Sequence, residues 1–87
     1  MFHYTYKTSG VCSQLIDIDL DGDIVKNVVF TGGCHGNLQG IGILVEGMSV
    51  DEIHDKLTGV RCGDKGTSCP DQLSRAVKKA YEASKKG

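Results

Sequence analysis

The sequence predicts an α+β domain in which a three-stranded antiparallel meander carries helices packed on one face. Apolar and polar residues alternate over residues 2–30, which is typical of half-buried strands, and a hairpin turn interrupts this pattern. Apolar residues recur at helical spacing after residue 34. The chain of 87 residues is the size of one small domain, so we expect a single domain over residues 1–87.

The strands are expected at residues 2–7 and in both arms of a hairpin at residues 13–30. FHYTYK (2–7) alternates aromatic with polar side chains, as a short edge strand does. The first arm of the hairpin places aspartates on one face and apolar residues on the other, namely Ile16, Ile18 and Leu20. Asp21-Gly22 is expected to supply the turn before the return strand.

Two later segments predict amphipathic helices with marked ends. In GMSVDEIHDKLTGV (47–60), Ser49 and Glu52 have the spacing of a capping box, and Gly59 stands where a left-handed residue ends a helix. The last helix is expected to begin at Cys69-Pro70. Its apolar residues follow the helical period: Leu73, Ala76, Val77, Ala80 and Tyr81.

A glycine-rich helix is expected between the hairpin and the capped helix, within residues 34–47. Its apolar residues have helical spacing: Leu38, Ile41, Leu44 and Val45. Glycines at positions 36, 40 and 42 each weaken a helix by about 1 kcal/mol relative to alanine. We therefore expect the backbone of this helix to pack closely against the sheet.

Charge and hydropathy exclude several classes of partner and location. The net charge of −1 provides no basic face for phosphates, so we expect no nucleic-acid partner. No stretch approaches the ~20 apolar residues of a membrane span, and the N-terminus lacks the apolar run of a signal peptide. We expect a cytoplasmic protein whose thiols stay reduced, which makes its four cysteines candidate ligands or reactive groups.

Three cysteines lie at the ends of predicted elements. Cys12 precedes the second strand, Cys34 follows the third, and Cys69 opens the last helix. In an antiparallel meander, the start of strand two and the end of strand three meet at one end of the hairpin. We therefore expect Cys12 and Cys34 to be neighbours, and thiolates gathered there suit zinc or an iron–sulfur cluster.

Other roles for the cysteines remain open at this point. Cys62 is either a fourth ligand or a resolving thiol that pairs with Cys69. Cys12 and Cys34 are small enough to serve as buried apolar residues instead. A helix N-terminus favours a thiolate, which makes packing alone a weaker explanation for Cys69.

The stretch GTSCPDQL resembles the signature of the TSCPD domain family, through Thr67, Ser68, Cys69, Pro70 and Asp71. The resemblance covers nearly the whole chain. This module also occurs near the C-terminus of adenosylcobalamin-dependent ribonucleotide reductases, which implies a link to ribonucleotide reduction. The chain is too short to hold the barrel, radical site and nucleotide pocket of such a reductase, so we do not expect an enzyme by itself.

A more distant resemblance is to iron–sulfur scaffold proteins of the IscU and NifU type. It rests on Cys12 before a strand, Cys34 in the turn Gly-Cys-His-Gly, Cys69 at the closing helix, and the stretch EGMSVDEI (46–53). It implies a scaffold-like fold with a three-cysteine metal site. Gln14 stands where the scaffolds have an aspartate, and Ser68 stands where they have a histidine. With Cys62 as the replacement ligand, a closed zinc site of four thiolates is favoured.

These observations predict a small metal-binding accessory module associated with ribonucleotide reduction. The alternatives are a redox thiol carrier that supplies electrons to the reductase through Cys62 and Cys69, an iron–sulfur scaffold-like protein, and a purely structural module. The expected partners are a ribonucleotide reductase or a redox protein. A homodimer is also expected, formed through the edge strand at 2–7 or through the helical face.

Overall fold

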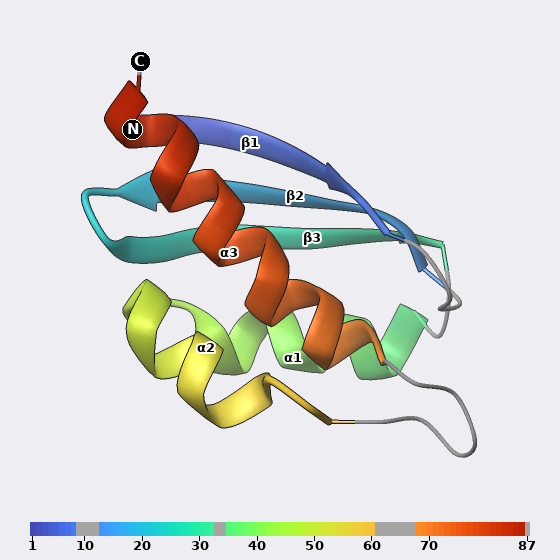
Figure 1. Ribbon diagram of the computed structural model, residues 1–87. Helices are drawn as coiled ribbons and strands as arrows, with labels where there is room; N and C mark the ends of the chain where they lie inside the picture. The colour runs from blue at the N-terminus through green and yellow to red at the C-terminus, as the bar shows by residue number, and fades with distance from the viewer. Residues whose placement is uncertain (9–12, 33–34, 61–67, 87) are drawn as a thin grey trace.

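The computed structural model describes residues 1–8, 13–32, 35–60 and 68–86. Three strands are followed by three helices (Figure 1): β1 (Phe2–Lys7), β2 (Ser13–Asp21), β3 (Ile24–Gly32), α1 (His35–Val45), α2 (Val50–Leu57) and α3 (Cys69–Lys86). The strands form one antiparallel sheet in the order β1-β2-β3. The predicted α+β fold class is confirmed.

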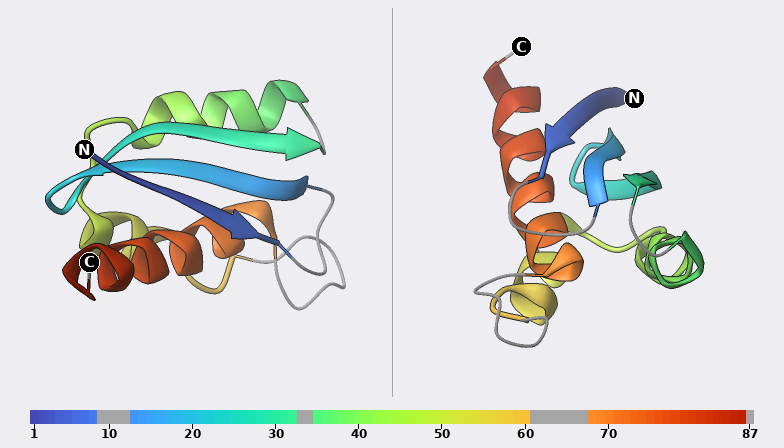
Figure 2. Two further views of the ribbon diagram at one scale, coloured as in Figure 1. Left: turned by 90° about the horizontal axis from the view of Figure 1, so that it is seen from above. Right: turned by 90° about the vertical axis from the view of Figure 1, so that its right-hand side faces the viewer.

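The core lies between one face of the sheet and the helices. Ile16, Ile18 and Leu20 on β2 are at most 1 % exposed. They belong to one apolar cluster with residues of all three helices, including Leu73 and Val77 of α3. Figure 2 shows the helices on one side of the sheet, with the other face open, as the alternation of β2 predicted.

The hairpin turn lies one residue later than predicted. Asp21 still pairs with Ile24, so the two loop residues are Gly22 and Asp23 rather than Asp21 and Gly22. Gly22 has φ +64°, a left-handed conformation that favours glycine. The glycine therefore occupies the first loop position, where it fits without strain.

A bulge in β3 was not predicted. The pairing shifts between Asp17 and Asp19 of β2, where β3 contributes one extra residue. Asn27 lies in this bulge with φ +51°. Its backbone N–H donates to Glu46 Oε1 at 2.8 Å, and its side-chain Nδ2 donates to Asp19 Oδ2 at 3.1 Å. Two carboxylates therefore hold this left-handed residue.

Helix α1 packs as closely as predicted, but its buried face differs from the one that periodicity suggested. A Cβ at Gly42 would lie 2.8 Å from the Val28 carbonyl oxygen, so the helix backbone touches the strand there. This contact turns Leu38 and Val45 inward, each 4 % exposed. Leu44, one of the four apolar residues at helical spacing, is 78 % exposed because it lies on the opposite side of the helix from that contact.

The other two helices match their predicted ends and faces. The Glu52 backbone N–H donates to Ser49 Oγ at 3.1 Å, and the Ser49 N–H donates to Glu52 Oε1 at 3.4 Å, which completes the capping box of α2. Gly59 has φ +89°, as expected after the last turn of a helix. The apolar stripe of α3 is buried as predicted, with Tyr81 only partly so.

Candidate functional site at the start of α3

Cys69 is the first residue of α3 and is 6 % exposed. Its place at the helix start confirms the sequence prediction. Cys12, Cys34 and Cys62, the other predicted site residues, lie outside the described residues. Pro70 follows in the first turn, where its missing N–H removes no helical hydrogen bond.

Ser68 caps α3 and joins it to the chain that follows α2. Its Oγ accepts from the Asp71 N–H at 3.2 Å, as an N-cap side chain does. The same hydroxyl donates to the Val60 carbonyl at 2.5 Å. Ser68 therefore fixes the position from which Cys69 starts the helix.

Asp71 provides a second connection between the two helices. Its Oδ2 forms an ion pair with Arg75 Nη2 at 3.1 Å. The Asp71 side chain is 2 % exposed, whereas the Arg75 side chain is 54 % exposed. Oδ1 accepts from the Gly59 N–H at 2.8 Å. The Asp71 carboxylate therefore joins the first turn of α3 to the residue that follows the end of α2.

A third connection runs through hydroxyl groups. Thr58 Oγ1 donates to Ser74 Oγ at 3.1 Å, and Ser74 Oγ donates to the Asp71 carbonyl at 2.6 Å. We call the residues of these three connections the α2–α3 clamp: Thr58, Gly59, Val60, Ser68, Asp71 and Ser74. The spacing Ser68-x-x-Asp71, together with a helix-ending Gly59, is the sequence signal that could have indicated it.

The start of α3 lies at the same end of the molecule as several other element ends. The two views in Figure 2 place the start of β2, the end of β3 and the starts of α1 and α3 at this end. Ser13 of β2 pairs with Gly32 of β3, as the meander predicted. Among the residues that the structure describes, no three His, Cys, Asp or Glu side chains are grouped to hold a metal.

A polar cluster that the sequence reasoning missed lies on the open face of the sheet. His3 Nδ1 and Asp19 Oδ1 are 2.6 Å apart, and His3 Nε2 and Asp17 Oδ1 are 3.3 Å apart. Thr5 Oγ1 donates to Asp17 Oδ1 at 2.6 Å. The hydrogen bond with Asp19 raises the pKa of His3, and the same bond lowers the pKa of Asp19. The cross-strand pairs His3–Asp19 and Thr5–Asp17 bring these groups together.

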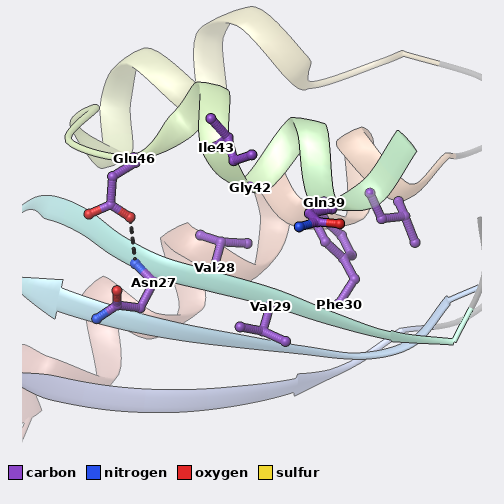
Figure 3. Close-up of a pocket in the computed structure, with 9 residues that line it drawn as sticks. Asn27, Val28, Val29, Phe30, Gln39, Gly42, Ile43 and Glu46 are labelled. Atoms are coloured by element: carbon purple, nitrogen blue, oxygen red, sulfur yellow. Dashed lines mark hydrogen bonds between the residues drawn. The ribbon is translucent and has the colours of Figure 1, made fainter. Parts of the chain in front are cut away.

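A groove of about 350 Å³ lies between β3 and α1, and it too was missed. Figure 3 shows Val28 and Phe30 on the strand side and Ile43 on the helix side. The Asn27–Glu46 hydrogen bond lies at one end of the groove. The spacing of strand and helix depends on the bulge at Asn27 and on the contact between Gly42 and Val28. Both join residues that are distant in sequence, so no local sequence pattern predicts the groove.

Comparison with known proteins agrees with the motif at the start of α3. The TSCPD domain family matches residues 4–81, which is more than half of the chain. No curated protein and no solved structure shows significant similarity. None of the helices within the described residues is long and apolar enough to cross a membrane. The chain belongs to the TSCPD domain family.

Proposed function

We propose that the protein is a small metal-binding module that holds zinc or an iron–sulfur cluster through Cys12, Cys34 and Cys69. The pairing of Ser13 with Gly32 is the observation that carries this proposal. Cys12 directly precedes Ser13, and Cys34 follows Gly32 by two residues. Both cysteines thus belong to chain segments that leave the same end of the sheet, where α3 also begins.

The α2–α3 clamp supports a ligand role for Cys69. A metal ligand works best when neighbouring hydrogen bonds fix its position. Ser68 and Asp71 flank Cys69, and their side chains bind Val60 and Gly59 beyond the end of α2. The first turn of α3 is therefore held from both sides, which keeps the Cys69 backbone in place.

Cys62 is proposed as the fourth ligand. The hydrogen bond between Ser68 Oγ and the Val60 carbonyl joins the two ends of the segment that contains it. Cys62 is two residues from Val60, and Cys69 is one residue from Ser68. Four thiolates make a closed zinc site, whereas three leave an open position for an assembling cluster.

The hydrogen bond between Ser68 and Val60 also favours a second candidate, a redox thiol pair. Cys62 and Cys69 would form a disulfide and release two electrons and two protons, which reduce a disulfide of the partner to two thiols. Metal analysis and thiol counting separate the candidates. Metal binding predicts that Cys69→Ser removes the metal, whereas the redox pair predicts that Cys62→Ser and Cys69→Ser equally prevent the disulfide without any metal loss.

The proposed partner is a ribonucleotide reductase or a redox protein that serves one, and the protein is proposed to act as its accessory rather than as an enzyme. The support is the TSCPD motif, because the TSCPD module also occurs near the C-terminus of such reductases. Binding of the full chain to a purified adenosylcobalamin-dependent reductase tests this part. We expect saturable binding that Cys69→Ser weakens; binding unaffected by this change, or absent, would contradict it.

A further inference from the structure

We propose that α1 forms a two-fold interface with a second copy of this chain, centred on Gly40, Ile43 and Leu44. These residues are three and four positions apart, so they share one surface of the helix. This inference does not rest on the proposed metal site. It selects the α1 side of the molecule rather than the β1 edge for self-association.

Helix α1 carries large apolar residues on its outer side as well as on its inner side. Ile43 and Leu44 are 69 % and 78 % exposed, whereas the inner residues Leu38 and Val45 are each 4 % exposed. Residues 35–45 contain no Asp, Glu, Lys or Arg. A helix with large apolar side chains on two opposite sides is normally covered on both, and the outer side of α1 has no such cover among the described residues.

Ile43 and Leu44 form a ridge on α1, and the surface on both sides of this ridge has the shape that a two-fold contact needs. The groove between β3 and α1 lies on the Ile43 side (Figure 3). A second hollow of about 190 Å³ lies on the Leu44 side and is lined by Met48 and Leu57. In a two-fold interface the same patch supplies both the ridge and the hollow, so the ridge of each copy can insert beside the helix of the other.

Among the described residues, no other element packs closely against Gly40. A Cβ at this position would meet no atom within 4 Å, in contrast to the contact at Gly42. A glycine inside a helix weakens it, and no contact among the described residues requires a glycine at this position. The close approach of a second helix would explain why a glycine stands at position 40.

Charge favours a second copy over a charged partner. A two-fold axis brings the residues beside the axis near their own equivalents, so a charged centre would repel itself, whereas the centre of α1 is uncharged. Charges occur at the rims of the grooves, as Glu46 and Lys56. When two α1 helices cross antiparallel at Gly40, Glu46 of each lies toward the N-terminal, positive end of the other helix. A standard interface takes about 800 Å² per partner, which is about a sixth of the 5056 Å² surface of the chain.

Sedimentation of the full chain over a range of concentrations tests the interface. We expect a monomer–dimer equilibrium that Ile43→Asp combined with Leu44→Asp weakens at least 100-fold. Lys79→Asp is the matched control, because it changes the charge by the same amount at an exposed residue of α3, and it should dimerise like the wild type. Circular dichroism checks that each variant is folded.

Gly40→Gln provides an independent variant, since it favours the isolated helix but should obstruct the close approach and weaken the dimer at least 10-fold. A wild-type chain that stays monomeric at about 1 mM, where even weak specific complexes form, would overturn the proposal. A dimer that persists unchanged in the double variant, as expected for pairing through β1 or with another surface, would also overturn it.

Discussion

Asp71→Ala should destabilise the fold measurably, because the Asp71 carboxylate joins the start of α3 to the end of α2. The change removes the acceptor of the Gly59 N–H and the partner of Arg75. A hydrogen bond to a charged group contributes about 1.5–3 kcal/mol. The ion pair adds at most about 1 kcal/mol, since Arg75 is 54 % exposed and water screens it.

The expected loss is therefore about 1.5–4 kcal/mol. At about 0.05–0.15 kcal/mol per residue, a chain of this length has a total free energy of unfolding of about 4–13 kcal/mol. Urea unfolding followed by circular dichroism measures the loss as a lower midpoint with an unchanged slope. Asp71→Ala should thus remove a large share of the stability of the domain.

Two control variants separate the hydrogen bond from the charge. Asp71→Asn keeps an oxygen that can accept from the Gly59 N–H but loses the ion pair and the charge that strengthens the hydrogen bond, so it should lose about 1–2 kcal/mol. Arg75→Ala removes only the exposed partner and should lose about 1 kcal/mol or less. An Asp71→Ala variant within about 0.5 kcal/mol of the wild type, as for an ordinary surface change, would refute the role given to this carboxylate.

Further predictions concern α1 and the open face of the sheet. Gly42→Ala should lower the free energy of unfolding by about 1–3 kcal/mol because its Cβ would meet the Val28 carbonyl, whereas Gly40→Ala should raise it by up to about 1 kcal/mol in dilute, monomeric protein; equal effects in urea titrations would contradict the packing described. The His3 ring should titrate above its usual pKa of 6.5 by NMR, and Asp19→Asn should return it toward that value. Since the pKa of His3 is raised in the folded state, its stabilisation is complete below pH 6.5 and disappears as the pH rises through the folded-state pKa; a titration midpoint at or below 6.5 would argue against the cluster.

The parts of the fold predicted correctly are those that local patterns determine. The Ser49–Glu52 capping box and the left-handed Gly59 lie within a few residues of the helix ends they mark. Alternation placed Ile16, Ile18 and Leu20 in the core because a strand has a fixed two-residue period. The α3 stripe was predicted for the same reason, with the helical period.

The errors occur where distant residues determine the outcome. Helix α1 has apolar residues on all sides, so periodicity could not show that Gly42, rather than Leu44, faces the sheet. The bulge at Asn27 depends on Glu46, which is 19 residues away along the chain.

The same distinction applies to the candidate site. The sequence motif predicted Cys69 at the start of α3, and this is confirmed. It could not show that Asp71 binds Gly59, because that contact joins two helices. The gathering of Cys12, Cys34 and Cys62 around Cys69 stays a prediction.

The metal content of the tag-free protein and of its Cys69→Ser variant tests the central proposal most directly. We expect about one zinc ion or one iron–sulfur cluster per wild-type chain. Cys69→Ser should lose the metal and remain folded, since serine is tolerated at helix N-termini. Cys62→Ser should lose it as well if the site has four thiolates, and should keep most of it if Cys62 lies outside the site. A wild-type protein without metal, or a Cys69→Ser variant that retains all of it, would contradict the proposed function.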